Sequence, residues 1–168
     1  MDYSKFKKIN TFIFDVDGVL TDCGLLITEK GEFLRKMNVR DGAAIKMALN
    51  QGFRVAIITK GNSTGVKDRL LALGADPVFD AVSNKAKALK ELESNYNIDP
   101  MRSVYMGDDL ADLTVFDKVL LATCPNDAAP EVIRQAEFVS ARKGGDGCVR
   151  DLIERVMKVQ GKWGNDYF

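Results

Sequence analysis

A short apolar run that ends in two acidic residues and a glycine constrains this chain most strongly. Residues 12–14 read Phe-Ile-Phe and are followed by Asp15, Val16, Asp17 and Gly18. Apolar side chains at consecutive positions predict a strand buried on both faces, as in a parallel sheet. Because residues i and i+2 of a strand point to the same side, we expect Asp15 and Asp17 to project together. Two like charges there are unfavourable without a cation or a shared proton; a polar turn after a strand is the simpler alternative.

The rest of the chain alternates strand-like and helix-like segments. Apolar periodicity and end signals predict a helix that starts at an Asp41 N-cap and stops at Gly52, a second that ends at Gly74, and others near 83–95, 131–136 and 148–159. Further strands are expected at 54–58, 77–82, 103–106, 119–122 and 138–139. Such alternation favours a parallel sheet with right-handed crossovers. With no internal repeat or linker, we expect one three-layer α/β domain over residues 1–168.

An insertion follows the first strand, where a helix is usual. Residues 25–28 and 32–39 flank the turn Glu29-Lys30-Gly31 and predict a β-hairpin over about residues 24–39. An isolated two-stranded hairpin is marginal in water, so it should lean on its own domain or on another subunit. Its place beside Asp15 makes it a candidate lid or interface element, and an insertion without a function is the alternative.

The absence of histidine limits the chemistry more than the charge balance does. No histidine occurs among the 168 residues, which excludes Ser-His-Asp and Cys-His nucleophilic sites and histidine-ligated metals. Acid–base chemistry must then use carboxylates, lysine or tyrosine. The 24 basic residues equal the 24 acidic ones, which argues against a nucleic-acid partner held by bulk charge.

Cysteine usage and the first residues bear on location. Cys23, Cys124 and Cys148 are far apart and form no CxxC pair, which predicts a reduced cytosolic protein rather than a disulfide scaffold or a zinc site. Residues 1–8 lack the apolar core of a signal peptide, and no apolar run approaches membrane-spanning length. We therefore expect a cytoplasmic protein without a membrane partner.

Polar residues from four segments are expected to meet at one edge of the sheet. Ligands of open α/β sheets bind outside the carboxyl ends of the strands. Asp15 and Asp17, Thr59, and Asp108 each follow a predicted strand, and Lys85 opens the helix after a fourth one. A lysine in a first helical turn faces the positive end of the helix dipole, so a nearby anion would compensate it. A solvated lysine is the alternative.

The types of these residues indicate a phosphate site. Asp109 and Asp112 fit the N-cap and N3 positions of the next helix, which favours capping for Asp109 and leaves Asp108 freer to bind a metal. A threonine hydroxyl beside the amides of a loop suits a phosphate, as Thr59 would provide. Oxygen ligands without histidine or cysteine favour Mg²⁺, and the available nucleophile is then a carboxylate. EF-hand, dinucleotide-binding and P-loop motifs are not matched.

The order Asp15-x-Asp17-Gly18, Thr59, Lys85 and Gly107-Asp108-Asp109-x-x-Asp112 resembles the haloacid dehalogenase (HAD) superfamily of phosphotransferases. The resemblance implies a Rossmann-like fold and an Asp15 that attacks phosphorus to form an aspartyl-phosphate. Asp17 would protonate the leaving alcohol and then activate water. Thr59 and Lys85 would hold the phosphoryl oxygens. Mg²⁺ would be held by the Asp15 carboxylate, the Asp17 backbone carbonyl and Asp108.

A closer resemblance covers nearly the whole chain. The hairpin, Asn38-Val39-Arg40-Asp41-Gly42, the glycine-rich stretch 144–150 and Gln160-Gly161-Lys162 are similar to the 3-deoxy-D-manno-octulosonate 8-phosphate (KDO-8-P) phosphatases. This resemblance implies a phosphatase of KDO and lipopolysaccharide biosynthesis that has no cap domain. It also implies a homotetramer in which neighbouring subunits supply the lid, with the tail at about 161–168 reaching a neighbouring site.

The resemblance leaves the substrate contacts open. Arg40 would contact the anionic sugar acid, and pairing with Asp41 is its alternative role. Lys60, Gly61 and Asn62 follow the motif threonine, where the family usually has glycine and then basic residues. Relatives that act on nine-carbon sugar acids can carry glutamate at the position of Gly61, so the glycine favours the eight-carbon substrate. A nine-carbon sugar-acid 9-phosphate stays the alternative substrate, and a receiver-like or non-catalytic phospho-binding module is the alternative class.

Overall fold

Six parallel strands form the centre of the structure, a computed structural model that describes residues 3–164. Each pair of neighbouring strands is parallel, and β1 lies between β4 and β6. The motif that follows β1 therefore leaves the sheet at its middle. In sheet order the strands are β5 (Val78–Phe79), β4 (Arg54–Ile58), β1 (Thr11–Phe14), β6 (Ser103–Met106), β7 (Leu121–Cys124) and β8 (Phe138–Val139).

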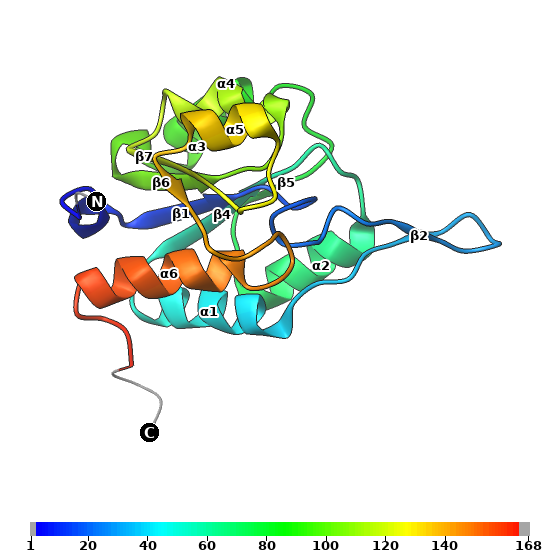
Figure 1. Ribbon diagram of the computed structural model, residues 1–168, viewed down its shortest axis with the longest axis horizontal. Helices are drawn as coiled ribbons and strands as arrows, with labels where there is room; N and C mark the ends of the chain where they lie inside the picture. Colours follow the sequence, from blue (N-terminus) through cyan, green and yellow to red (C-terminus); the bar gives the residue numbers. More distant parts are fainter. Residues whose placement is uncertain (1–2, 165–168) are drawn as a thin grey trace.

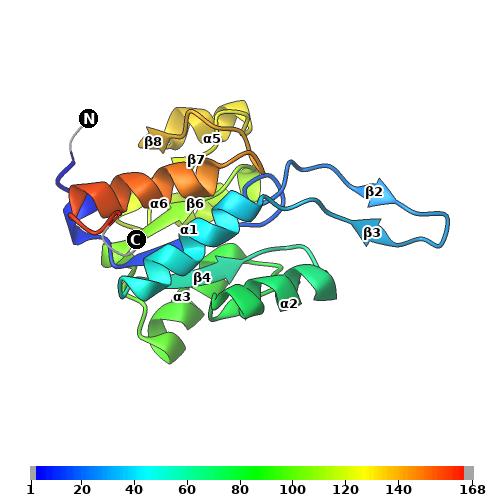
Figure 2. The ribbon, with the colours of Figure 1, turned by 90° about the horizontal axis from the view of Figure 1, so that it is seen from below.

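Helices cover both faces of this sheet (Figures 1 and 2). One face carries α1 (Val39–Asn50), α2 (Thr64–Leu73) and α6 (Cys148–Val159), and the other carries α3 (Lys85–Tyr96), α4 (Leu113–Phe116) and α5 (Pro130–Gln135). Within β1, Phe12 and Phe14 join the core under α1 and α6, whereas Ile13 joins the opposite core. Three 3-10 turns complete the described elements: η1 (Phe6–Lys8), η2 (Pro100–Arg102) and η3 (Leu110–Asp112). The predicted three-layer α/β fold is confirmed.

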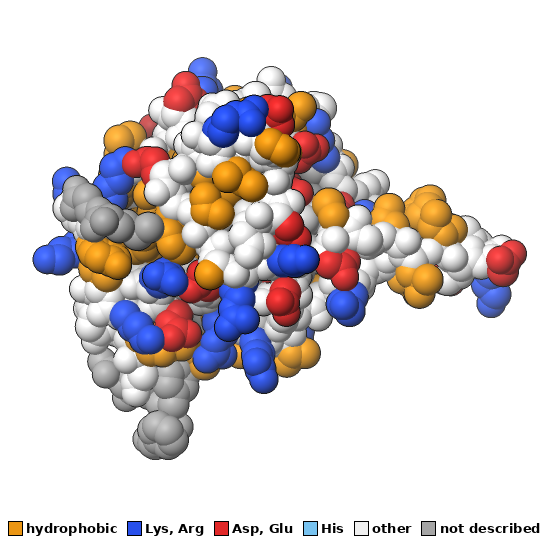
Figure 3. Space-filling view, in the orientation of Figure 1, with side chains coloured by type: hydrophobic (Ala, Val, Ile, Leu, Met, Phe, Trp, Pro, Cys, Tyr) orange, Lys and Arg blue, Asp and Glu red, His pale blue; other side chains and the backbone are white. Residues whose placement is uncertain are grey.

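A β-hairpin projects from the body of the molecule between β1 and α1 (Figure 2). Its strands are β2 (Leu26–Ile27) and β3 (Phe33–Leu34), which pair antiparallel. The second strand is much shorter than the predicted 32–39, and all four residues of the two strands are exposed. Hydrophobic side chains gather along this arm in Figure 3. Within residues 3–164, this hairpin is the only regular secondary structure between β1 and α1.

The start of α1 differs from the prediction. Asn38, not Asp41, is the N-cap, because its side chain accepts a hydrogen bond from the Arg40 amide at 2.8 Å. Asp41 is buried instead, and its Oδ1 accepts a hydrogen bond from the Arg150 amide at 2.8 Å. Asp41 thus joins the first turn of α1 to the first turn of α6. The predicted strand 119–122 also shifts to β7, because Leu121 is the residue that pairs with Val104 of β6.

The buried Asp41 makes stability depend on pH. Burial raises the pKa of Asp41 to about 6, against the opposing hydrogen bonds from the α6 amides. When the pKa of a carboxyl is higher in the folded than in the unfolded state, the protein loses stability as pH rises from the unfolded-state pKa through the folded-state pKa. We expect Asp41→Asn to gain about 2 kcal/mol of stability relative to the native chain between pH 4.5 and 7.5, as measured by urea unfolding. The exposed Asp68→Asn is the control, and a pH-independent difference for Asp41→Asn would contradict the assignment.

The end of the described chain returns to the body. The Gln160 side chain donates to the carbonyl oxygens of Phe6 and Ile9, each at 2.8 Å, and fastens the end of α6 to η1. Residues 165–168, half of the predicted reaching tail, lie outside the described residues. No helix in residues 3–164 is long and apolar enough to span a bilayer.

Candidate active site

Asp15 lies directly beyond the carboxyl end of β1, where its amide continues the sheet pattern by donating to the Met106 carbonyl at 3.0 Å. Its side chain is buried. Oδ1 accepts a hydrogen bond from the Val16 amide at 2.6 Å, and Oδ2 lies 2.6 Å from the ammonium of Lys85. Neighbours on both oxygens therefore fix the orientation of this carboxylate.

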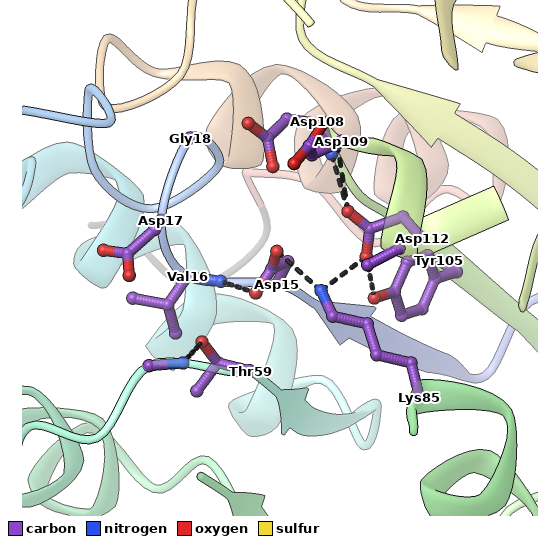
Figure 4. A network of polar contacts seen from close by, with 12 residues as sticks. Asp15, Val16, Asp17, Gly18, Thr59, Lys85, Tyr105, Asp108, Asp109 and Asp112 are labelled. Carbon is purple, nitrogen blue, oxygen red and sulfur yellow. Dashed lines mark hydrogen bonds and ion pairs between the residues drawn. The ribbon is translucent and has the colours of Figure 1, made fainter. Parts of the chain in front are cut away.

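Lys85 joins two buried carboxylates. Its Nζ lies 2.6 Å from Asp15 Oδ2 and 2.6 Å from Asp112 Oδ1, and the three side chains form a row in Figure 4. The lysine is the first residue of α3, so the anion expected to compensate it there is present twice over. Burial alone would lower the pKa of Lys85, but Asp15 and Asp112 outweigh it, so the pKa is raised and the ammonium stays charged.

Asp112 is fully engaged as a support. Oδ1 accepts from Lys85 and from the Tyr105 hydroxyl, and Oδ2 accepts from the amides of Asp108 and Asp109 at 3.1 Å each. A carboxylate has about four acceptor positions, and these contacts use them. The predicted capping relation between Asp109 and Asp112 is confirmed in η3. Burial and Asp112 raise the pKa of Tyr105 well above its usual value, so it remains a donor.

Asp15 and Asp108 are the two carboxylates suited to a divalent cation. Oxygens of Asp15, Asp108 and Asp112 lie within 4.8 Å of one another, and Asp112 is already saturated. Burial, followed by the charges of Asp15 and Asp112, raises the pKa of Asp108 to about 7, and burial and Asp112 raise that of Asp15 to about 6 against the effect of Lys85. A hard cation between Asp15 and Asp108 would offset this repulsion, so the donor set fits Mg²⁺.

Gly18 keeps the motif loop close to Asp108. It has φ +83°, and a Cβ built there would lie 1.9 Å from Asp108 Oδ2. A glycine is therefore required both by backbone conformation and by space. Cys23 also lies here, with Sγ 3.7 Å from the same Oδ2. Burial and Asp108 raise the pKa of Cys23 to about 11, so its thiol is protonated at neutral pH.

The i, i+2 argument predicted that Asp15 and Asp17 project together from a strand, but Asp17 is not part of a strand. β1 ends at Phe14 and the chain turns after Asp15, so the strand rule no longer applies. The Asp17 carboxylate instead receives Arg35, whose Nε lies 2.7 Å from Oδ1 and whose second nitrogen lies 3.2 Å from Oδ2. In Figure 4, Asp17 and Lys85 lie on opposite sides of Asp15.

Thr59 follows β4 at the edge of the sheet where the carboxyl ends of the strands lie, which we call the rim. It is buried, and its hydroxyl accepts a hydrogen bond from the Gly61 amide at 3.1 Å. Gly61 lies beside both motif residues, since a Cβ there would be 3.0 Å from Asp17 Oδ2 and 3.4 Å from Thr59 Oγ1. Lys60 and Asn62 are exposed on the same loop. The rim thus unites the segments of Asp15, Thr59 and Lys85, as the sequence predicted.

Two arginines line different hollows of the subunit. Arg40 lines a separate hollow with Arg142, Asp146 and Arg150, so within one subunit it is not grouped with Thr59 and Asp17. Arg35 was not among the predicted site residues. The available signal was its position on the hairpin strand that returns toward the motif, but sequence spacing does not give the path of that return.

Comparison with known proteins identifies the family. The sequence model of the haloacid dehalogenase-like hydrolase family matches residues 75–152 of this chain. The 3-deoxy-D-manno-octulosonate 8-phosphate phosphatase KdsC of Escherichia coli K12 is 39% identical over 159 residues, which are 95% of this chain and 85% of that protein. The chain belongs to the KdsC family of HAD-like hydrolases.

Solved structures of this family superimpose closely. The KdsC-type phosphatase of Yersinia pestis has a TM-score of 0.93 and 34% identity, over 96% of this chain and 87% of that one. The phosphatase of Moraxella catarrhalis, solved with magnesium, phosphate and KDO, has a TM-score of 0.92 and 28% identity, over 96% and 92%. Because it belongs to the KdsC family, the protein is a phosphoric monoester hydrolase. Mg²⁺ is the cofactor that the site residues fit.

Proposed function

We propose that this protein is a Mg²⁺-dependent phosphatase that hydrolyses KDO-8-P to KDO and phosphate through an aspartyl-phosphate. The observation that carries the proposal is the Asp15 carboxylate, held between the Val16 amide and the Lys85 ammonium at 2.6 Å each, at the mouth of the sheet. Membership of the KdsC family supports the substrate. A receiver-like or non-catalytic module has no comparable support.

The residues divide the reaction between them. An oxygen of Asp15 attacks phosphorus as the bond to the sugar oxygen breaks, and Asp17 gives its proton to that oxygen. Asp17 then takes a proton from water, whose oxygen attacks the aspartyl-phosphate, and phosphate and free Asp15 result. Lys85 and Thr59 bind phosphoryl oxygens. Mg²⁺, held by Asp15, Asp108 and the Asp17 carbonyl, would neutralise phosphoryl charge.

Phosphate release tests this function directly. Purified protein with KDO-8-P and Mg²⁺ should release phosphate, and chelation of the metal should stop the release. A nine-carbon sugar-acid 9-phosphate is the comparison substrate, because position 61 lies against Asp17 and any side chain there would limit the leaving group. If neither sugar-acid phosphate gave Mg²⁺-dependent release of phosphate, the proposal would be contradicted.

The hairpin supplies the reason to propose a homotetramer with lids from neighbouring subunits. Leu26, Ile27 and Phe33 have exposed fractions of 66%, 62% and 59% on an arm that projects from the domain. Side chains of this size, gathered on one arm, indicate a surface that is covered in an assembly. The small described insertion also leaves the rim without a lid of its own.

A charge placed on this arm should separate the subunits. We expect tetramers for the native chain and a smaller species for Phe33→Asp by light scattering, with at least about tenfold lower kcat/KM for KDO-8-P, because a carboxylate is strongly disfavoured in an apolar interface. Lys30→Asp, at the exposed turn, is the matched control. A monomeric native chain at assay concentration would remove the basis for shared lids.

We also propose a cytoplasmic location. Cys23, Cys124 and Cys148 are all free thiols, which suits a reducing compartment. Fractionation of the native host would test it.

A further inference from the structure

Arg35 makes a two-pronged contact with the second aspartate of the motif. The Arg35–Asp17 distances are 2.7 Å from Nε to Oδ1 and 3.2 Å from the terminal nitrogen to Oδ2. The guanidinium side chain is only 10% exposed, whereas that of Asp17 is 35% exposed. This planar, paired geometry fixes both the position and the plane of a carboxylate, which a single hydrogen bond does not.

The contact joins the base of the hairpin, just after β3, to the motif loop that follows β1. Arg35 directly follows β3, and it lines one hollow with Asp17, Thr59 and Gly61. A Cβ at Gly61 would lie 3.6 Å from the Arg35 terminal nitrogen as well as 3.0 Å from Asp17 Oδ2. The arginine is therefore packed against the loop after the motif threonine, so it is held from two sides.

We infer that Arg35 is a positioning residue that holds the Asp17 carboxyl where it exchanges a proton with the leaving sugar oxygen. The inference rests on the proposed function, in which Asp17 is the acid and base. Proton transfer requires the acid within hydrogen-bond reach of the oxygen that departs, so freedom of the Asp17 side chain costs rate directly. A neighbouring subunit that moves the hairpin would act on Asp17 through the same contact.

A purely structural role for Arg35 makes a different prediction. If Arg35 only fastens the hairpin, its loss should lower kcat/KM for all substrates alike, because substrate binding and phosphoryl positioning would be impaired together. If Arg35 acts through Asp17, its loss should matter only when the leaving oxygen needs a proton. Sugar alkoxides need one, whereas p-nitrophenolate is stable as the anion.

The test compares kcat/KM, which reports the steps through departure of the alcohol, on KDO-8-P and p-nitrophenyl phosphate. We expect Arg35→Ala to lose about 10–100-fold on KDO-8-P, less than the roughly 10²–10⁴-fold of general acid catalysis because Asp17 itself remains, and less than about threefold on the aryl phosphate. Arg35→Lys should recover only part of the loss, because an ammonium cannot hold both oxygens. The control is Lys36→Ala, the next residue, whose side chain is 80% exposed and pairs with Asp22 instead.

A double variant provides the second measurement. In Asp17→Asn, the added Arg35→Ala change should cost less than about twofold on KDO-8-P, because the two residues would act as one unit. Equal losses on both substrates, or full additivity with Asp17→Asn, would overturn the inference while the native chain remains an active phosphatase. A native chain that is inactive on both substrates would instead overturn the proposed function.

Discussion

Asp15→Asn is expected to lower kcat for KDO-8-P by about 10⁴-fold or more, because the amide retains the shape of the side chain but cannot attack phosphorus. The native carboxylate is oriented by the Val16 amide and Lys85, and asparagine can keep the first of these contacts. The loss should therefore arise without unfolding. Phosphate release and a thermal unfolding midpoint, measured on the same preparation, separate the two effects.

Trapping of the phosphorylated enzyme gives an independent measurement. Acid quenching of the native chain during turnover should leave phosphate attached to the protein, and Asp15→Asn should carry none. Asp22→Asn, an exposed aspartate of the same loop region, is the matched control and should retain both activity and trapping. Turnover like that of the native chain by Asp15→Asn would exclude the aspartyl-phosphate mechanism.

Lys85→Met should destabilise the fold by about 3–5 kcal/mol, in addition to abolishing most activity, because it leaves two buried carboxylates without their shared cation. Asp15 and Asp112 are 7% and 0% exposed, and Lys85 bridges them at 2.6 Å to each. The penalty should shrink as pH falls toward 5, where a carboxyl of raised pKa such as Asp15 takes up a proton. Urea unfolding at several pH values measures it.

A paired substitution distinguishes charge from packing. Lys85→Met combined with Asp112→Asn removes one negative charge together with the positive one, so stability should partly return while activity does not. Lys90→Met, on the exposed side of the same helix, is the control. An equally unstable double variant would mean that lost packing, rather than unpaired charge, accounts for the effect of Lys85→Met.

Local patterns were sufficient where the residue pattern itself determines the conformation. β4, β6 and α6 lie at the predicted residues, because continuous apolar runs and a strong helical periodicity leave few alternatives. The gathering of the segments of Asp15, Thr59, Lys85 and Asp108 also followed from the sequence, since parallel strands bring their carboxyl ends to one edge.

Local patterns failed where a distant partner decides the outcome. Asp41 has the form of an N-cap, but the amide of Arg150, far along the chain, takes its carboxylate, and Asn38 caps α1. Arg40 and Arg35 are both near the motif in sequence, yet the fold sets Arg35 on Asp17 and places Arg40 with Arg142 and Arg150.

The acidic stretch after β1 shows the same division. A nucleophile-like carboxylate at the end of a buried strand was predictable from the residues alone, because the apolar run, the glycine and the absence of histidine are local or compositional properties. The contacts that hold these aspartates depend on the folded chain: Lys85 holds Asp15, four donors hold Asp112, and Arg35 holds Asp17. The physical reason is that a buried charge is stabilised by partners within a few ångströms, and those partners come from segments that only folding brings together.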